Sequence, residues 1–273
     1  MAATAPVPAG VGERIWQRFS PAQRLTRFAV YLVIVAAIVA SIRTVEVIPE
    51  FLADAPEQVV DLVTRMWPPD WGHYPETVHA ALMETLHIAS LGTLLALLLA
   101  LPVGILAAHT LVPSTPVNLA AKLILVSSRS VNSLVWALLF VGIFGPGALA
   151  GTLAIAFRSI GFVGKLFGEA LEEAQPGPIE ALTAAGAPWA SRMTFGYWPQ
   201  VSPAFWSIAL FRWDINVRES AVLGLVGAGG IGMALDSALN LFEWPRVAVV
   251  LAAIFAVVIV AEILVTQLRK RVI

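Results

Sequence analysis

A small number of charged and hydroxyl-bearing side chains interrupt the long apolar stretches of this sequence. Those that could meet a charged ligand are Ser127, Ser128, Arg129, Asn132, Arg212, Asp214, Asn216 and Arg218. An ionisable residue inside a membrane-spanning segment is costly, which makes it a functional hypothesis by default. The planar guanidinium group of arginine suits phosphate or phosphonate oxygens, because it can donate two parallel hydrogen bonds. We therefore predict that these residues line a path for an anion, with Arg129 and Arg212 as its cations.

A structural role for the same charges is the main alternative. Asp214 and Arg218 are four residues apart, so they can pair on one face of a helix. Arg212 lies two residues before Asp214 and points to a different sector of that helix. Arginines in membrane segments can also cap helix ends or lie in subunit interfaces, and Arg158 adds a further cation of this kind.

The composition shows that these charges lie in an unusually apolar sequence. Of 273 residues, 58% are hydrophobic and 13% are charged, whereas an ordinary soluble domain carries about 25% charged residues. A water-soluble globule could not bury this much apolar surface, but a bilayer can solvate it. The net charge of −1 gives no basic surface for nucleic acid, and the absence of cysteine excludes disulfides and thiolate metal sites. The 4 histidines show no ligand spacing, so we expect no metal site.

The apolar segments have the length of membrane helices. A helix needs about 20 apolar residues to cross the hydrocarbon core of a bilayer. The segments that approach this requirement are 28–42, 77–109, 120–144, 148–167, 201–226 and 247–267. We therefore expect an all-α membrane protein with about six transmembrane helices.

The distribution of lysine and arginine predicts the orientation, because positively charged loops stay on the cytoplasmic side. Residues 1–27 contain four arginines and the tail 269–273 contains three basic residues, whereas 44–76 contains seven acidic residues and one arginine. We therefore expect a multi-pass protein of the cell membrane with both termini in the cytoplasm. The expected organisation is a cytoplasmic segment 1–27, a first transmembrane helix 28–43, an extracytoplasmic acidic loop 44–76, a membrane core 77–268 and a cytoplasmic tail 269–273.

Residues 169–200 break the apolar pattern of the membrane core. This segment is too polar to insert into a bilayer and too rich in alanine for a simple linker. Pro176 and Pro178 should end the preceding helix and open a short one at about 179–185, since proline suits the first helical turn. Glu180 then lies near the N-terminus of that helix, where the helix dipole favours a carboxylate. Such a short helix is not stable alone in water, so we expect it to dock on another surface.

The short helix also carries residues at a recognisable spacing. Those that could couple it to a partner are Glu180, Ala181, Leu182, Ala185, Gly186 and Pro199. The spacing of the glutamate, first alanine, glycine and proline resembles the EAA loop of ABC-import permeases. Leu182, Gly196 and Trp198 depart from the usual alanine, isoleucine and leucine. The resemblance implies a coupling helix that fits a groove on a cytoplasmic ATPase, and the alternative is a solvated loop between two spans.

Longer stretches extend the resemblance. The runs 134–140, 160–167, 212–220 and 222–232 closely resemble the phosphonate-importer permeases, and the similarity covers about 77–268. It implies the type I ABC importer permease fold and alternating-access import of phosphonate or a related oxyanion, with phosphate or phosphite as the alternative cargo. It also implies two ATP-binding subunits, a second permease copy and an extracytoplasmic substrate-binding protein. Asn132 and Ser133 stand where Pro-Glu is commoner in that family, a difference that bears on which oxyanion is carried.

Nucleotide binding by this chain is not expected. Gly227, Gly229 and Gly232 have the spacing of a dinucleotide-binding fingerprint, but that pattern has meaning only between a strand and a helix. The phosphate-binding loop pattern of ATPases does not occur in the sequence, so we expect ATP and Mg²⁺ on a partner and no cofactor or catalytic site here. The other possible functions are a secondary anion transporter, which often shows inverted repeats, and a membrane enzyme, which needs clustered catalytic side chains.

Overall fold

The computed structural model describes residues 19–45 and 48–272. Nearly all of them are helical, and they divide into two units, one up to Val60 and the other from Asp61 onward. The expected cytoplasmic segment 1–27 lies outside the described residues up to position 18, and the tail 269–273 does so at its last residue.

The first unit contains α1 (Pro21–Thr44) and most of α2 (Pro49–Arg65). Ser20 caps α1, because its hydroxyl accepts a hydrogen bond from the backbone of Gln23 and the Gln23 side chain accepts one from the backbone of Ser20. This cap and Pro21 start the helix well before the apolar run at 28. The helix α2 lies inside the segment 44–76, for which the sequence analysis predicts only an acidic loop.

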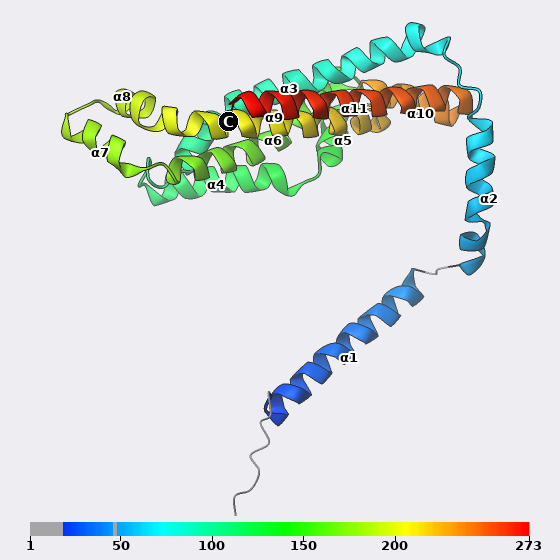
Figure 1. Ribbon diagram of the computed structural model, residues 1–273, viewed down its shortest axis with the longest axis horizontal. Helices are drawn as coiled ribbons and strands as arrows, with labels where there is room; N and C mark the ends of the chain where they lie inside the picture. Colours follow the sequence, from blue (N-terminus) through cyan, green and yellow to red (C-terminus); the bar gives the residue numbers. More distant parts are fainter. Residues whose placement is uncertain (1–18, 46–47, 273) are drawn as a thin grey trace, which may run out of the picture. The chain divides into compact units, whose positions relative to one another are not determined.

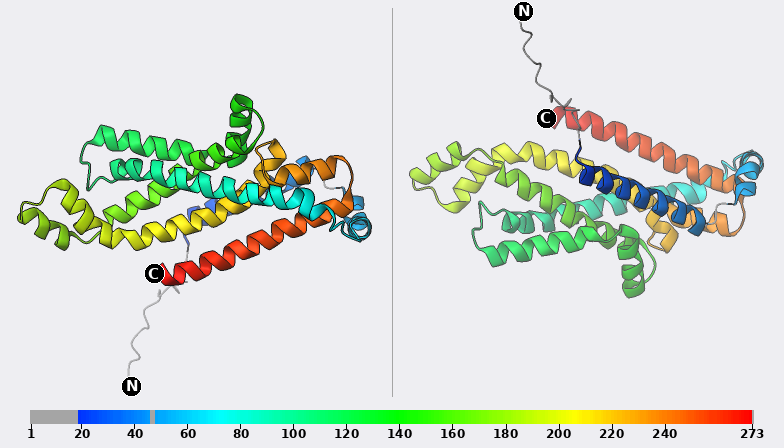
Figure 2. Two further views of the ribbon diagram at one scale, coloured as in Figure 1. Left: turned by 90° about the horizontal axis from the view of Figure 1, so that it is seen from above. Right: turned by 90° about the horizontal axis from the view of Figure 1, so that it is seen from below.

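The second unit is a bundle of helices joined by short connections. After α2 its elements are η1 (Tyr74–Val78), α3 (His79–Ala107), α4 (Thr115–Ser130), α5 (Ser133–Phe144), α6 (Ala148–Glu172), α7 (Pro176–Ala184), α8 (Trp189–Ser191), η2 (Arg192–Tyr197), α9 (Trp198–Leu223), η3 (Gly224–Val226), α10 (Ile231–Asn240) and α11 (Trp244–Val272). The long helices α3, α6, α9 and α11 run side by side, and α7 and α8 project from one end of the bundle (Figure 1, Figure 2).

The number of possible membrane spans in the structure agrees with the number predicted from the sequence. Within the described residues, the helices long and apolar enough to cross a membrane are Pro21–Thr44, Tyr74–Ala107, Ala148–Glu172 and Trp244–Arg271. Two bent pairs qualify only together: α4 with α5, at an angle of 91°, and the segment containing α9 with α10, at 41°. If each bent pair crosses once, the total is the predicted six.

The third predicted span, 120–144, is not one continuous helix. It breaks between α4 and α5, where Asn132 has an extended backbone and its side chain accepts a hydrogen bond from the backbone N–H of Leu134. A side chain that caps a new helix in this way ends the previous one. The polar patch predicted inside a span therefore lies at a sharp bend.

Small residues let α3 and α6 approach each other closely. A Cβ atom on Gly104 of α3 would lie 2.9 Å from the carbonyl oxygen of Gly164 on α6. Lipid tails are as apolar as leucine, so helices in a bilayer associate through close van der Waals contact between small residues. Gly104 and Gly164 provide such a contact.

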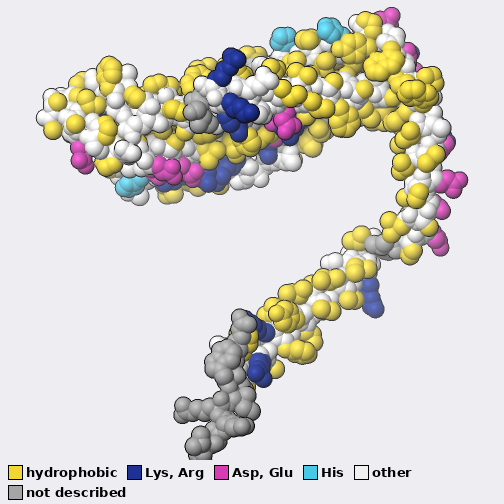
Figure 3. All heavy atoms as spheres, viewed as in Figure 1, with side chains coloured by type: hydrophobic (Ala, Val, Ile, Leu, Met, Phe, Trp, Pro, Cys, Tyr) yellow, Lys and Arg dark blue, Asp and Glu magenta, His cyan; other side chains and the backbone are white. Residues whose placement is uncertain are grey.

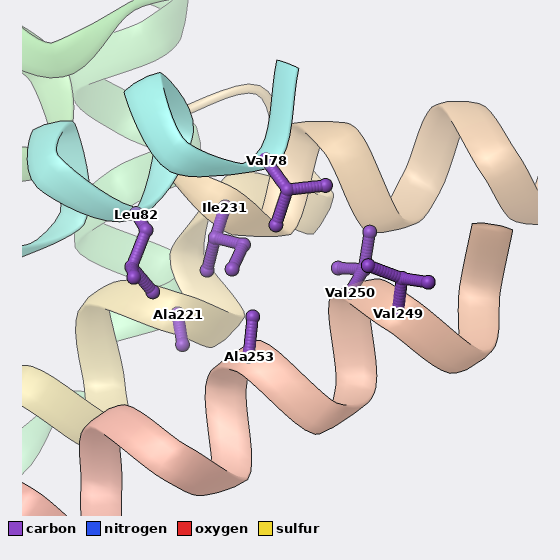
Figure 4. Close-up of a cluster of buried hydrophobic side chains, with 7 residues drawn as sticks. All are labelled: Val78, Leu82, Ala221, Ile231, Val249, Val250 and Ala253. Atoms are coloured by element: carbon purple, nitrogen blue, oxygen red, sulfur yellow. The ribbon is translucent and has the colours of Figure 1, made fainter. Parts of the chain in front are cut away.

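A cluster of buried apolar side chains holds α10 and α11 against α3 (Figure 4). Its members are Val78, Leu82, Ala221, Ile231, Val249, Val250 and Ala253. The backbone N–H of Ile231, at the start of α10, donates a hydrogen bond to the Thr85 hydroxyl of α3 at 2.7 Å. This bond satisfies one of the free N–H groups at the helix start.

The surface of the bundle is strongly apolar. Figure 3 shows hydrophobic side chains over most of its visible face, with charged side chains gathered at a few places. Large apolar residues such as Leu98 and Phe255 are more than half exposed, at 67% and 65%. A soluble monomer rarely exposes an apolar surface of this extent, whereas a bilayer solvates it.

Replacing Gly151 by alanine should disturb the packing between α6 and the turn before α10. The added Cβ would collide with the carbonyl oxygen of Ala228. Overpacking of this kind costs about 1–3 kcal/mol, so we expect the unfolding temperature of the detergent-solubilised protein to fall by about 2–12 °C. Gly142→Ala is the matched control, because a Cβ there meets open space. Equal unfolding temperatures for the two variants would contradict the close contact.

Candidate anion site and coupling surface

Two adjacent helices each carry an arginine near the middle. Arg158 is the eleventh of 25 residues in α6, and Arg212 is the fifteenth of 26 residues in α9. At a rise of 1.5 Å per residue, both lie roughly 15–21 Å from either end of their helix. Burial at that depth requires partners that replace water around the guanidinium groups.

Glu219 links the two arginines. A terminal nitrogen of Arg212 lies 3.4 Å from one carboxylate oxygen of Glu219, and a terminal nitrogen of Arg158 bonds the other oxygen. The Arg212 guanidinium also lies 5.6 Å from the centre of the Phe162 ring, within the range of a cation–π contact. Two cations thus share one carboxylate, which leaves an excess of positive charge.

A chain of buried hydrogen bonds fixes Arg212 in place. Its Nε donates to the Ser159 hydroxyl at 2.8 Å, and that hydroxyl donates to Oδ1 of Asn216 at 3.2 Å. The Asn216 amide donates to the Thr93 hydroxyl at 2.8 Å, which donates to the carbonyl of Ala89 at 2.6 Å. The chain joins α3, α6 and α9. Its three uncharged side chains are all buried, so this network specifies how the three helices fit together.

The two arginines line a cavity of about 390 Å³ with residues from the end of α4. The lining residues are Val126, Arg129, Ser130, Arg158, Phe162 and Arg212. None of the ion pairs found in the described part of the chain involves Arg129. Three guanidinium groups therefore surround a space large enough for a small oxyanion, with Glu219 as the nearest bonded carboxylate. The arrangement can bind an anion by charge-assisted hydrogen bonds.

Only some of the residues predicted to line an anion path lie at this cavity. Arg129 and Arg212 share it. Ser128 is buried and forms hydrogen bonds with two backbone groups of α6, so it fastens α4 to α6. Asn132 caps α5, and Ser127 is exposed and does not line the cavity.

The other predicted path residues lie elsewhere on α9. Arg218 pairs with Asp214, as the four-residue spacing predicts, and its guanidinium lies 3.9 Å from Glu262 of α11. Oδ1 of the buried Asp214 has no hydrogen-bond partner among the described residues. Asn216 belongs to the buried chain that holds Arg212. None of the three lines the cavity, and Asn216 supports it through Ser159 and Arg212.

Glu219 is not among the functional residues predicted from the sequence. It lies seven residues, about two helical turns, after Arg212, and that spacing puts both on one face of α9. Its link to Arg158 joins positions 61 residues apart. The contact of Glu219 with Arg212 could have been predicted from the spacing in the sequence. The contact with Arg158 depends on the packing of α6 on α9.

The predicted short helix in the segment 169–200 is present as α7. It begins at Pro176, three residues before the expected 179, and ends next to Gly186. Gly186 has a φ of +72°, a conformation that residues with a side chain rarely adopt. The backbone N–H of Ala187 donates to the carbonyl of Leu182 at 3.0 Å, which closes the helix end.

The helix α7 has a packed face and an exposed face. Ile179 and Leu182 lie close to Gly196 of η2, where an added Cβ would meet them at 3.4 and 3.3 Å. A side chain larger than glycine at this position would therefore have to displace Ile179 and Leu182. From position 180 onward the exposed residues of the helix and its end are Glu180, Ala181, Thr183, Ala184, Ala185 and Gly186. Small side chains next to one carboxylate leave a surface that another protein can approach closely.

Gln200 ties the start of α7 to α9. Its Oε1 accepts a hydrogen bond from the backbone N–H of Gln175 at 2.9 Å, and its Nε2 donates to the carbonyl of Gly196 at 2.7 Å. Pro199 is exposed beside it in the first turn of α9. The helix that carries Arg212 therefore starts at the base of the exposed surface of α7.

Removing the charge of Glu219 should destabilise the bundle. Glu219→Gln leaves Arg158 and Arg212 without their shared counter-ion, at a cost of about 1–3 kcal/mol, so we expect the unfolding temperature in detergent to fall by about 2–12 °C. The matched control is Glu262→Gln, because Glu262 also faces an arginine but its side chain is 65% exposed. If the two variants unfold at the same temperature, Glu219 does not hold the arginines together.

The sequence is similar to those of known transport proteins. A family described as binding-protein-dependent transport system inner membrane component matches residues 100–273. The phosphate-import permease protein PhnE of Mycolicibacterium smegmatis is 36% identical over 234 residues, which cover 86% of this chain and 44% of that protein. This chain therefore spans less than half of that relative. The phosphite transport system permease protein PtxC of Stutzerimonas stutzeri is 37% identical over 212 residues, 78% of this chain and 77% of that protein.

The fold also matches a solved transporter. An inward-facing structure of the MetNI methionine ABC transporter superposes with a TM-score of 0.63 at 21% identity, over 72% of this chain and 96% of that chain. The predicted type I importer permease fold is thereby confirmed. With several helices that can cross a membrane, the chain is a multi-pass membrane protein. It belongs to the family of inner membrane components of binding-protein-dependent transport systems.

Proposed function

We propose that this chain is the transmembrane permease subunit of an ATP-driven importer of phosphorus oxyanions, with phosphonate as the main cargo and phosphate or phosphite as the alternatives. The observation that carries the proposal is the cavity lined by Arg129, Arg158 and Arg212. An oxyanion that crosses a bilayer must exchange its hydration water for other donors, and guanidinium groups provide them in the right geometry. The relatives named for phosphate and phosphite import support a cargo of this chemistry.

Three cations and one internal carboxylate suggest how the cargo is held. Arg129 is the cation outside the Glu219 network, so it meets the oxyanion first. Arg158 and Arg212 stay bonded to Glu219 when no cargo is present, which avoids two uncompensated charges inside the membrane. The bend between α4 and α5 lies directly after Arg129 and Ser130, and a change in this bend alters the access to the cavity.

The exposed face of α7 is the surface that couples this chain to ATP hydrolysis by a partner subunit. The candidate contact residues on this face are Glu180, Ala181, Ala185 and Gly186, with Pro199 exposed beside them in α9, while Leu182 packs against η2 and positions them. The partner is one of two cytoplasmic ATP-binding subunits. These subunits bind ATP and Mg²⁺, and this chain has no nucleotide site or catalytic function of its own. A second permease copy, identical or related, and an extracytoplasmic substrate-binding protein complete the importer.

This function requires α7 to face the cytoplasm. The basic tail at 269–273 and the arginines of segment 1–27 support cytoplasmic termini, because positive charge stays inside. The acidic segment 44–76 then faces the outside. The domain organisation predicted from the sequence stands as part of this proposal.

Arg129→Ala should impair transport without unfolding the protein. Loss of a charged hydrogen bond to the cargo costs about 1.5–3 kcal/mol, which predicts roughly a tenfold or greater loss of uptake. The measurement is uptake of phosphonate, phosphite and phosphate by vesicles that contain the chain, its ATPase and its binding protein. Arg65→Ala is the control, since the Arg65 side chain is 60% exposed and pairs with Asp61 on the same helix. The unmodified chain is also tested in vesicles that lack the ATPase. Uptake that persists in those vesicles would contradict the whole proposal and favour a secondary transporter.

Gly186→Val should uncouple the importer. Valine cannot adopt the +72° φ of this position without strain, so the end of α7 must change shape. We expect weaker co-purification of the ATPase, or ATP hydrolysis that the cargo and binding protein no longer stimulate. Glu180→Ala tests the exposed carboxylate of the same surface. Gly142→Val controls for the loss of a glycine, because it lies in α5 with open space around it. Normal assembly and stimulation in both α7 variants would exclude this surface as the coupling site.

A further inference from the structure

The helix α2 separates its polar and apolar side chains sharply. At about 100° per residue, the polar positions fall within an arc of roughly 120° on the helix circumference. They are Glu50, Asp54, Glu57, Gln58, Asp61, Thr64 and Arg65. The rest of the circumference is apolar, and Phe51, Leu52, Val59 and Val63 on it are between 59% and 67% exposed. A helix with these two faces is stable where water meets an apolar phase.

The length of chain around α2 limits which apolar phase it can reach. The helix α1, long and apolar enough to cross the membrane, ends at Thr44, and α2 begins five residues later at Pro49. Five residues span at most about 18 Å. A helix of 17 residues is about 25 Å long, too short to cross a bilayer core of about 30 Å. The start of α2 is therefore confined to the vicinity of the membrane surface where α1 ends.

The segment after α2 is fixed at the end of another membrane helix. The backbone N–H of Asp70 donates to the carbonyl of Pro245 at 3.2 Å, and Nε of Arg246 lies 3.5 Å from the Asp70 carboxylate. Pro245 and Arg246 belong to the first turn of α11, which is long and apolar enough to cross the membrane. The residues that follow α2 thus lie at the level where α11 begins.

Two exposed tryptophans mark the same level. Trp67 and Trp71 flank the fixed Asp70, and they are 75% and 61% exposed. Tryptophan is enriched at the boundary between lipid headgroups and acyl chains, because its ring is largely apolar and its N–H is polar. Their position beside the start of α11 agrees with that boundary.

We propose that α2 lies flat in the interface of the bilayer, on the side where α1 ends, with its apolar face in the lipid and its acidic face in water. The partner is the lipid surface itself. The polar face carries four carboxylates and one arginine, so attraction to anionic headgroups cannot drive the binding. The apolar face supplies the attraction, and the association is accordingly insensitive to salt. The inference is independent of the cargo.

Site-directed spin labels test this position directly, because the chain has no cysteine of its own. Val59→Cys places a label on the apolar face and Glu57→Cys places one on the polar face of the same helix. Each full-length chain is reconstituted with its ATPase into vesicles of phosphatidylcholine. The accessibility of each label to oxygen, which concentrates in lipid, is compared with its accessibility to a water-soluble nickel complex.

We expect the label at Val59 to be about 5–10 Å inside the headgroup boundary, the depth of interfacial helices. It should be at least tenfold less accessible to the nickel complex than the label at Glu57, in low salt and in 1 M NaCl alike. Val63→Cys provides a second apolar position if the first variant folds poorly, and the unfolding temperature of each variant is compared with that of the unmodified chain.

Equal accessibility of the Val59 and Glu57 labels to the nickel complex would overturn the proposal, because α2 would then lie in water. Protection of Val59 that appears only after the substrate-binding protein is added would also overturn it, since the apolar face would then be a protein docking site. Protection that is lost in 1 M NaCl would exclude an apolar attachment.

Discussion

The charge of Arg212 constrains the rest of this structure. A guanidinium group keeps its proton at any accessible pH, so burial in the middle of a helix requires neighbours that balance the charge. Glu219 supplies the counter-ion, and Ser159 supplies a hydrogen-bond acceptor on the adjacent helix. Ser159 donates a hydrogen bond to Asn216, and Asn216 donates one to Thr93. The groups that stabilise this one buried cation therefore also determine how α3, α6 and α9 pack. The small residues between α3 and α6 make that close packing possible.

The same helix connects the cation to the cytoplasmic surface that we propose for the ATPase. Gln200 fixes the start of α9 to the loop before α7, and Arg212 lies 12 residues further along, about 18 Å away. Gln200 and Arg212 belong to the same helix, so α9 is the element that joins α7 to the network of Arg212 and Glu219. The bend between α4 and α5 instead follows Arg129, which forms no ion pair among the described residues. The cavity is thus lined from one continuous helix, α9, and from the end of a helix that breaks, α4.

The membrane acts as the solvent for the outer surface of the bundle. Apolar side chains that would be unfavourable in water face outward, and polar groups are paired inside or placed at the ends. The helix α2 follows the same rule at the boundary between the two solvents, since its two faces match lipid on one side and water on the other. Arg129, Arg158 and Arg212 bring three charges of one sign together around the cavity.

Composition and local spacing were sufficient to predict an all-α membrane protein with about six spans, a short helix opened by Pro176, and the pairing of Asp214 with Arg218. Each of these depends on hydrophobicity or on residues within one or two helical turns. The break in 120–144 and the structural role of Ser128 were not predictable, because they depend on contacts between α4, α5 and α6. The link from Arg158 through Glu219 to Arg212 needs α6 to lie against α9, two helices separated by residues 173–197. Only the tertiary structure decides such a link, because the energy of a buried charge depends on which groups surround it in space.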